Sequence, residues 1–354
     1  MQTYSKPIRT LEDNEVFVFG SNEDGFHGAG AAGFAMLRES GNKWRETPVF
    51  GCGNLTLDKV PDGTQGYYAI KGMARGYQVG TAGRSYAICT VKKPGAKRSI
   101  PLENIAAQIK EMYAFARDNR DFWFIVASGV GKSLNGYSTE EMASAYACDV
   151  IPRNVSFQED FWNNYLAPLV HVEKIINATG HRQMYIGGRY QYINNRNDPE
   201  YLHIVDAISG FLRYVHEKKN VNSFMSGMAL GFDMAFAEAV VRLKSKGVPV
   251  RLIAMVPFKS QSSIWRAGSR VYYDWLLKWA DEIDVRYPNP TNKAEAAEYL
   301  NKRNFDMIDV SHGVIAYYNG QKKGGTYNCM TAARKFEVPV MAMDPVSLKF
   351  SAYN

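Results

Sequence analysis

Three glycine-rich segments in the C-terminal half carry residue types that can hold a phosphate group. Residues 226–233 read SGMALGFD, residues 179–182 read TGHR and residues 324–326 read GGT. Glycine lets a ligand approach the main chain closely, and a loop that opens a helix offers free N–H groups at the positive end of the helix dipole. Arg182 and Arg303 could add forked guanidinium groups. These features predict an anionic, phosphate-bearing ligand.

Other side chains of this half could contact the rest of such a ligand. Asp233 could accept hydrogen bonds from ribose hydroxyls, or it could cap the helix that follows. Trp265 and Phe258 could stack on a base, and the alternative for Trp265 is a place in the core. Arg303 could pair instead with Asp306 or Asp309 on the surface.

The N-terminal half offers two further loops of small residues, each after a predicted buried strand. The first strand is EVFVFG, residues 15–20, and a run of small residues then leads into a helix. The second is DFWFIVA, residues 121–127, followed by the loop SGVGKSLNGY. Loops of this kind bring phosphates close to backbone N–H groups.

These loops supply the candidate site residues of the N-terminal half. His27 could be a catalytic residue or a ribose contact, and a structural loop histidine is the alternative. Asp24 is a second candidate acid or base. The candidate ligand-binding residues are Ser21, Asn22, His27, Gly28, Ala29, Gly30, Ala31, Ser128, Gly129, Val130, Gly131, Lys132, Asn135, Gly136 and Tyr137.

The elements around the loops alternate between strand and helix, which is typical of α/β folds. In the C-terminal half we predict five strands, which end near Gly180, Ser226, Phe258, Gly320 and Asp344, with helices between them. This pattern predicts an open, parallel, doubly wound sheet, in which ligands bind beyond the carboxyl ends of the strands. A length of 354 residues predicts two domains, which we place at residues 1–169 and 170–354.

Composition narrows the classes of function. The net charge is +7 without a long Lys/Arg block, which favours phosphate-bearing ligands over nucleic acid. The four cysteines are scattered and form no CxxC pair, so the sequence does not predict a zinc site. The N-terminus has no apolar signal core and no long apolar run occurs, so we expect a cytoplasmic location, in a bacterial host cell if the gene is a phage gene, and no membrane partner.

The segments TGHR, GGRY, SGMALGFD, VPFKSQSSIW, NKRNFDMID, YNG and GGTYNC, in this order over residues 172–345, resemble the YpsA-type branch of the SLOG superfamily. SLOG proteins are Rossmann-like folds that bind or process nucleotide-derived ligands. The resemblance implies a pocket formed by Thr179, Gly180, His181, Arg182, Gly188, Ser226, Gly227, Met228, Gly231, Asp233, Pro257, Phe258, Trp265, Arg303, Asn304, Gly324, Gly325 and Thr326.

One relative of SLOG cleaves nucleotide N-glycosidic bonds with a PGGxGTxxE loop. The corresponding loop here is KKGGTYNCM, in which Lys323 replaces the proline and Met330 stands where the motif has its glutamate. The general acid or base of that reaction is therefore missing from its place.

The segments VFVFGSNEDGFHGAGAA, SYAICT, FIVASGVGKSLNGYSTEEMA and NVSFQEDFW, within residues 15–162, resemble a divergent branch of the macro domain, an ADP-ribose-binding α/β fold. The resemblance implies a mixed sheet, with Asn22 at the distal ribose and the two small-residue loops at the phosphates. Together the halves predict two three-layer αβα domains, one macro-like and one Rossmann-like.

The two resemblances predict a protein that binds, senses or sequesters an NAD-derived or ADP-ribose-like nucleotide in phage or bacterial immune signalling. Two other classes stay open. One is a hydrolase of an ADP-ribose derivative or a nucleotide N-glycosidic bond, with His27, Asp24 or Asp233 as acid or base. The other is a non-catalytic interaction scaffold. Mg²⁺ could accompany a diphosphate without any residue spacing that demands it, and we expect a homo-oligomer through the SLOG domain.

Overall fold

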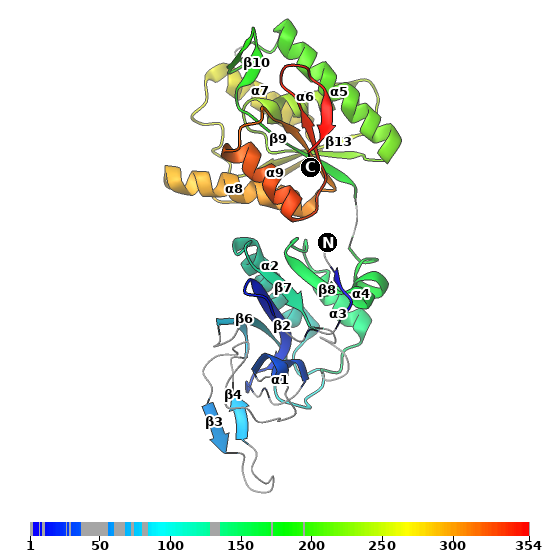
Figure 1. Cartoon of the computed structure of the whole chain (residues 1–354), viewed down its shortest axis with the longest axis vertical. Helices are drawn as coiled ribbons and strands as arrows, with labels where there is room; N and C mark the ends of the chain where they lie inside the picture. Colours follow the sequence, from blue (N-terminus) through cyan, green and yellow to red (C-terminus); the bar gives the residue numbers. More distant parts are fainter. Residues whose placement is uncertain are drawn as a thin grey trace. The chain divides into compact units, whose positions relative to one another are not determined.

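The computed structural model describes residues 3–6, 8, 11–25, 27, 30–36, 56–59, 68–71, 74–79, 84–127, 135–170, 173–193 and 195–353. The chain divides into two compact units, Met1–His171 and Val172–Asn354 (Figure 1). Each unit has its own sheet with helices on both faces, so the predicted α/β class is confirmed.

The described residues of the C-terminal unit form a seven-stranded sheet, and β17 is its one strand that runs antiparallel to its neighbour. In spatial order the strands are β14 (Glu282–Val285), β13 (Arg251–Val256), β12 (Ser223–Ser226), β9 (Ile175–Gly180), β15 (Gly313–Tyr317), β16 (Val340–Met343) and β17 (Phe350–Ala352). The chain runs outward from β9 to β14 and then returns to place β15 on the other side of β9. The strand order therefore reverses between β9 and β15, which is where such sheets bind ligands.

Five helices of this unit cover both faces of the sheet. They are α5 (Pro199–Lys219), α6 (Phe232–Ser245), α7 (Ala267–Trp279), α8 (Lys293–Val310) and α9 (Gly324–Lys335). Helix α6 packs against α5, α7 and three strands, whereas α8 and α9 pack together on the opposite face (Figure 1).

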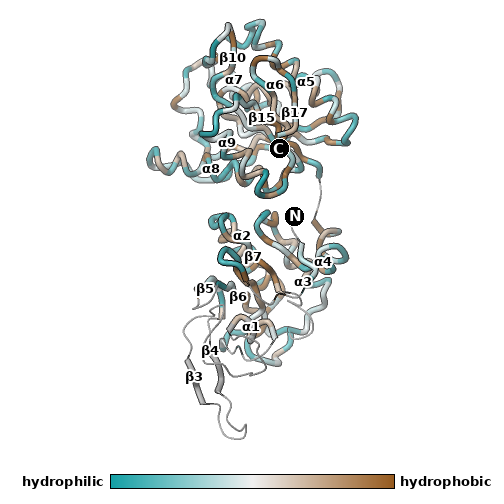
Figure 2. Tube along the Cα trace, in the orientation of Figure 1, coloured by the Kyte–Doolittle hydropathy of each residue, from teal (hydrophilic) through white to brown (hydrophobic). Residues whose placement is uncertain are grey.

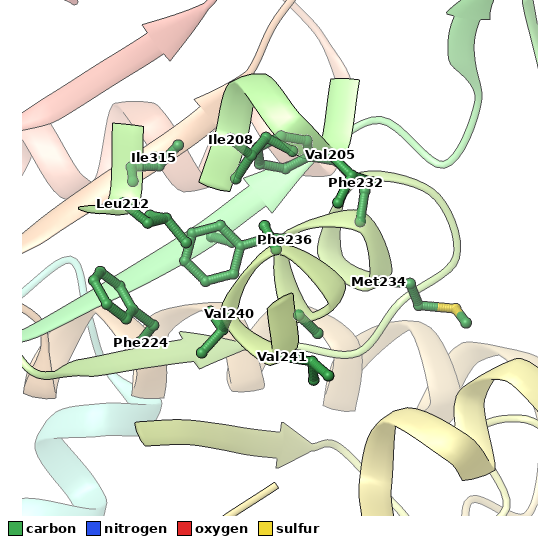
Figure 3. Packing of buried hydrophobic residues seen from close by; sticks show 14 of the residues in the cluster. Val205, Ile208, Leu212, Phe224, Phe232, Met234, Phe236, Val240, Val241 and Ile315 are labelled. Atoms are coloured by element: carbon green, nitrogen blue, oxygen red, sulfur yellow. The ribbon is translucent and has the colours of Figure 1, made fainter. Parts of the chain in front are cut away.

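The core explains why α6 is apolar around most of its circumference. In Figure 3, Ile208 and Leu212 of α5 face Phe236 and Val240 of α6, and Phe224 of β12 lies beneath them. Residues four positions apart share one side of a helix, so each helix presents a continuous apolar stripe to the other. Because α6 is enclosed by a sheet and two helices, almost all of its residues are buried.

The start of helix α5 is fixed by Asp198 and Pro199. The Asp198 side chain accepts hydrogen bonds from the N–H groups of Glu200, at 2.9 Å, and Tyr201, at 3.2 Å. Pro199 occupies the first helical position, where the N–H that proline lacks would have no acceptor within the helix.

The prediction of five strands in this half was incomplete. Strands β14 and β17 were missed because both are edge strands with little apolar signal, EIDV and FSA. A hairpin of β10 (Met184–Ile186) and β11 (Arg189–Gln191) was missed as well. Helix α8 ends at Val310, and Met307 and Ile308 near its end are buried.

The described residues of the N-terminal unit form a mixed, six-stranded sheet in which β5 runs antiparallel to β6 and the other neighbours are parallel. In spatial order the strands are β1 (Thr3–Tyr4), β8 (Val155–Gln158), β7 (Trp123–Val126), β2 (Glu15–Asn22), β6 (Arg84–Val91) and β5 (Gly76–Val79). A separate hairpin joins β3 (Thr56–Lys59) to β4 (Tyr68–Lys71). The mixed sheet agrees with the prediction for this half.

Alternating side chains of β2 bury both faces of this sheet. Val16 and Val18 belong to one core with α2 and α3, and Phe17 and Phe19 belong to a second core with α1. The described residues of this unit form the helices α1 (Gly30–Met36), α2 (Leu102–Asp118), α3 (Thr139–Tyr146) and α4 (Glu159–Phe161), and the π-helical turn η1 (Trp162–Leu166). Figure 2 shows the hydrophobic, brown segments along the central strands. No described helix has the length and apolarity to cross a membrane.

Replacing Gly180 by alanine is expected to lower the free energy of unfolding by about 1–3 kcal/mol, the usual cost of overpacking a core. A Cβ atom at Gly180 would lie 2.4 Å from the Cβ of Phe232. Phe232 is fully buried and stacks on Tyr317 with ring centroids 5.3 Å apart, so it has no room to withdraw. Urea titration followed by tryptophan fluorescence measures the change.

The matched control is Gly210→Ala on the exposed side of α5, where a Cβ would meet no atom within 4 Å. This variant should be as stable as the unmodified protein or up to about 1 kcal/mol more stable, because alanine is the better helix former. Equal stability of the two variants would show that the contact between Gly180 and Phe232 does not constrain the fold.

Candidate functional site

A cavity of about 380 Å³ lies in the C-terminal unit where the strand order reverses, and we call it the switch-point cavity. Strand β9 ends at its wall with Gly180, and the loops after β12 and β15 lead into α6 and α9 beside it. Nine predicted site residues line the cavity: Thr179, Gly180, His181, Arg182, Asp233, Arg303, Asn304, Gly325 and Thr326. Loops far apart in sequence thus meet at one edge of the sheet.

The loop after β12 is held by hydrogen bonds that fix the start of α6. The Ser226 hydroxyl donates to the Asp233 carbonyl at 2.7 Å and accepts from the Met228 N–H at 3.1 Å. Gly231 adopts a φ of 83°, and a Cβ there would lie 2.4 Å from the carbonyl oxygen of Arg182. Glycine is therefore required where this loop passes the end of β9.

Arg303 and Asp233 form a buried ion pair at the cavity. Arg303 is 3% exposed and Asp233 5%, and Nη1 of the arginine lies 3.8 Å from Oδ2 of the aspartate. Burial raises the pKa of Asp233 to about 6, although Arg303 opposes the shift. Burial also lowers the pKa of Arg303, and Asp233 opposes that shift. The aspartate therefore only partly compensates the buried guanidinium.

The guanidinium has capacity for a further acceptor. Its Nη1 donates to the Met255 carbonyl at 3.4 Å, but among the described residues its buried Nε has no hydrogen-bond partner. Gly227 makes room for it, since a Cβ there would lie 1.5 Å from Nη1. Asp306 and Asp309, the surface partners considered for Arg303, are themselves buried, and Asp306 accepts a hydrogen bond from the Tyr287 hydroxyl at 2.6 Å. Arg303 is thus directed to the cavity and not to the surface.

Two helices begin at the cavity without a side-chain cap. Helix α6 starts after Gly231 and α9 starts after Lys323, and neither residue offers a capping side chain. Gly325 and Thr326, in the first turn of α9, line the cavity. The N–H groups of a first turn and the helix dipole both favour an anion at this position.

His181 is held in a neutral form beside these groups. The Asn319 N–H donates to its Nε2 at 3.4 Å, so Nε2 is an acceptor and the ring proton lies on Nδ1. Burial lowers the pKa of His181, which keeps the ring neutral at pH 7. The residue can therefore donate one hydrogen bond without adding charge.

Sequence reasoning missed the part of the wall that comes from α8. Ala297, Leu300 and Asn301 line the cavity together with Asn304. Their spacing of three, four and seven residues places them on one side of a helix, and this spacing is a signal that could have found them. Ala229 of the α6 loop was also missed.

The remaining predicted residues of this half lie elsewhere. Gly231 and Trp265 line a second, larger recess that shares Arg182 with the switch-point cavity. Ser226 is the last residue of β12, Gly227 and Met228 follow it in the loop, and the Ser226 hydroxyl accepts a hydrogen bond from the Met228 N–H. Gly324 is the first residue of α9. Gly188 stands in the turn of the β10–β11 hairpin, while Pro257 and Phe258 follow β13, where Phe258 is buried against Tyr299.

In the N-terminal unit, the candidates gather at the carboxyl end of β2. Ser21 and Asn22 are its last residues and are buried, and the Ser21 hydroxyl lies 3.1 Å from Nε2 of His27. His27 is fully buried and packs edge-on against Phe19 at 5.2 Å. Burial lowers the pKa of His27 to about 4, so the ring is neutral at pH 7.

The other candidates of this unit differ in surroundings. Asp24 is exposed, and Gly30 and Ala31 open α1. Gly28, Ala29, Ser128, Gly129, Val130, Gly131 and Lys132 lie outside the described residues.

Asn135, Gly136 and Tyr137 lead into α3 and are engaged in packing. The Asn135 side chain accepts from the Tyr137 N–H at 3.0 Å, and the Tyr137 hydroxyl donates to the Ile100 carbonyl at 2.9 Å. Arg98 lies over the Tyr137 ring at 4.7 Å. Within the described parts of the chain, no group of three or more His, Cys, Asp or Glu side chains could hold a metal ion.

Acidification should destabilise the protein through His27. Its pKa of about 4 in the folded state lies below the value of 6.5 that is ordinary for histidine, so unfolding takes up a proton between these pH values and stability falls as the pH drops through them. A His27→Gln variant has no side chain at this position that takes up a proton on unfolding. The stability advantage of the unmodified protein over the variant should shrink by about 2 kcal/mol from pH 7 to pH 5.

Urea titrations of both proteins at pH 7 and pH 5 measure this difference. Gly210→Ala, on the exposed side of α5, removes no titrating group and is the control, so its stability relative to the unmodified protein should be the same at both pH values. A constant difference between His27→Gln and the unmodified protein would mean that the pKa of His27 is not lowered in the folded state.

Known proteins match the C-terminal unit. Residues 176–347 fit the model of the YpsA family, described as the YspA SLOG family. The uncharacterized SPbeta prophage-derived protein YoqJ of Bacillus subtilis strain 168 is 33% identical over 147 residues, which are 39% of this chain and 84% of that protein. A UPF0398 protein of Halalkalibacterium halodurans is 26% identical over 162 residues, 46% of this chain and 81% of that protein.

These matches confirm the SLOG resemblance of the C-terminal half and support a nucleotide-related role for it. The switch-point cavity lies within the matched residues. Through its C-terminal unit, the chain belongs to the YpsA family of SLOG proteins.

Proposed function

We propose that the C-terminal unit binds a nucleotide of the NAD-derived or ADP-ribose-like type, with its phosphates in the switch-point cavity. The observation that carries the proposal is the buried Arg303, whose Nε has no partner among the described residues. It lies beside a cavity that is also lined by Arg182 and by the first turn of α9. Guanidinium groups and open helix starts are the protein groups that best bind phosphate.

The remaining polar groups suit a ribose. Asn301, Asn304 and Thr326 line the same cavity and can donate to or accept from hydroxyl groups. Asp233, the one acid among the described lining residues, can accept from a ribose hydroxyl. The cavity therefore combines anion and hydroxyl recognition within about 380 Å³, which is in the range of small-molecule sites.

Binding without turnover is the favoured form of this function. In the glycosidase motif an acid stands where this chain has Met330, and that side chain is fully buried within α9. It supplies neither acid nor base to the cavity. Retention of the nucleotide fits a protein that senses or sequesters a signal.

The setting we propose is phage or bacterial immune signalling. One relative, from Bacillus subtilis, is named as prophage-derived. The N-terminal unit, proposed to be macro-like, would recognise the same class of ligand. Its mixed sheet and the buried Ser21, Asn22 and His27 at the end of β2 support this assignment.

Hydrolysis of an ADP-ribose derivative or of an N-glycosidic bond is the second candidate. Asp233 favours it, because burial raises its pKa to about 6, within the range useful to a general acid or base at neutral pH. His27 and Asp24 are weaker candidates in the N-terminal unit, because a pKa of about 4 makes His27 a poor base or acid at neutral pH and Asp24 is exposed.

Thermal unfolding in the presence of ADP-ribose, NAD and AMP tests binding. Ligand at about 100 times its Kd stabilises a protein by roughly 2.7 kcal/mol, so at least one nucleotide should raise the melting temperature by several degrees. Arg182→Gln should raise the Kd of that nucleotide by at least ~10-fold, since charge-assisted hydrogen bonds contribute about 1.5–3 kcal/mol.

Arg213→Gln, an exposed arginine of α5 outside both cavities, is the matched control and should bind normally. No shift with any nucleotide would favour the scaffold alternative. An equal rise in Kd for Arg182→Gln and Arg213→Gln would show that the nucleotide does not bind in the switch-point cavity.

Chromatography of the same nucleotides after incubation with stoichiometric protein tests turnover. We expect no product, because the position of the glycosidase acid is occupied by Met330. Product that disappears in Asp233→Asn but persists in Asp24→Asn would instead establish the hydrolase and assign its acid or base.

A further inference from the structure

Next to the switch-point cavity lies a recess of about 640 Å³ that the proposed phosphate site does not use, and we call it the aromatic recess. Its wall includes Tyr190 and Tyr192 of the β10–β11 segment, Trp265 of the loop before α7, and Tyr272 of α7. Arg182 lines both the recess and the switch-point cavity, so the two spaces meet at this side chain.

The mouth of the recess concentrates apolar surface that folding leaves exposed. Tyr190 is 37% exposed, Tyr192 49% and Ile264 91%, and all three line the recess. Single exposed apolar residues are ordinary, but a group of them around one hollow is typical of a binding site.

The rings in the depth of the recess are held in place by a buried acid. The hydroxyls of Tyr201 and Tyr272 lie 2.6 Å apart, and the Tyr272 hydroxyl donates to Glu238, which is 3% exposed. Arg242 donates to the same carboxylate at 3.0 Å. Because these hydroxyls and the carboxylate satisfy one another, the tyrosines offer ring surface and not free polar groups to the recess.

The charge of the recess is one-sided. Arg182, Arg189 and Arg266 line it, and the described lining residues include no Asp or Glu. Aromatic rings among arginines suit a planar group that is joined to an anion, since rings stack on bases and guanidinium groups pair with phosphate.

We propose that the aromatic recess holds the base of the nucleotide whose phosphates lie at Arg182 and in the switch-point cavity. This inference rests on the proposed function and deepens it. The ligand is then an extended nucleotide, in which a base and a ribose lie on opposite sides of a phosphate bridge. A base-free sugar phosphate would fill the switch-point cavity alone.

Calorimetric titration with ADP-ribose tests the base site on variants of exposed residues. Tyr192→Ala and Arg266→Ala should each raise the Kd by ~5-fold or more, in line with the effect of removing a stacking ring or a phosphate contact. Tyr214→Ala is the matched control: this tyrosine of α5 is 52% exposed and lines neither cavity, so its Kd should equal that of the unmodified protein.

Fluorescence gives a second readout that does not depend on affinity. A base stacked on Trp265 should quench its emission, so ADP-ribose should lower the fluorescence of the unmodified protein. Trp265→Phe keeps an aromatic ring and should bind with a Kd within ~2-fold of the original while losing the quench.

The outcomes separate this inference from the function on which it rests. If no nucleotide binds the unmodified protein, the proposed function fails and the base site fails with it. If ADP-ribose binds but Tyr192→Ala and Arg266→Ala bind it normally and the quench persists in Trp265→Phe, only the base site is overturned. Equal weakening by Tyr192→Ala and Tyr214→Ala also overturns it.

Discussion

The buried pair of Arg303 and Asp233 is the constraint to which the rest of the C-terminal site conforms. A guanidinium that is 3% exposed has lost nearly all of its water, and one aspartate oxygen at 3.8 Å and one carbonyl at 3.4 Å restore little of that hydration. A buried charge with incomplete pairing is costly to the fold. The anion proposed to bind in the cavity would lower this cost.

The surrounding backbone is shaped to admit this charge. Gly227 leaves the volume that the guanidinium occupies, and Gly231 lets the α6 loop pass the end of β9. The Ser226 hydroxyl ties the loop to the first turn of α6, which holds Asp233. Each glycine is thus explained by a close contact with a named neighbour, which is Arg303 for Gly227 and the Arg182 carbonyl for Gly231.

The two units differ in the charge and exposure of their candidate site residues. In the N-terminal unit, a histidine and a serine are hydrogen-bonded at the end of β2, but His27 is fully buried and carries no charge at neutral pH. In the C-terminal unit, charges remain at the cavity and aromatic rings remain exposed next to it. The stronger functional signal therefore lies in the unit whose family is known.

The sequence by itself determined the elements that alternate along the chain and the residue types at their ends. Strands β9, β12, β13, β15 and β16 were predicted because their apolar runs end in polar or glycine-rich loops. The edge strands β14 and β17 gave no such signal, since an edge strand buries too little apolar surface to produce a pattern.

Only the tertiary structure decided which candidates meet. Strand order is not encoded in local periodicity, so the adjacency of the loops after β9, β12 and β15 emerges only when the sheet forms. Packing of α8 on the sheet then decided that Arg303, which the sequence left open as a phosphate contact or a surface partner of Asp306 or Asp309, is buried at the switch-point cavity beside Asp233. The tertiary structure also separated Trp265 from the switch-point cavity, because the loop before α7 lines the aromatic recess instead.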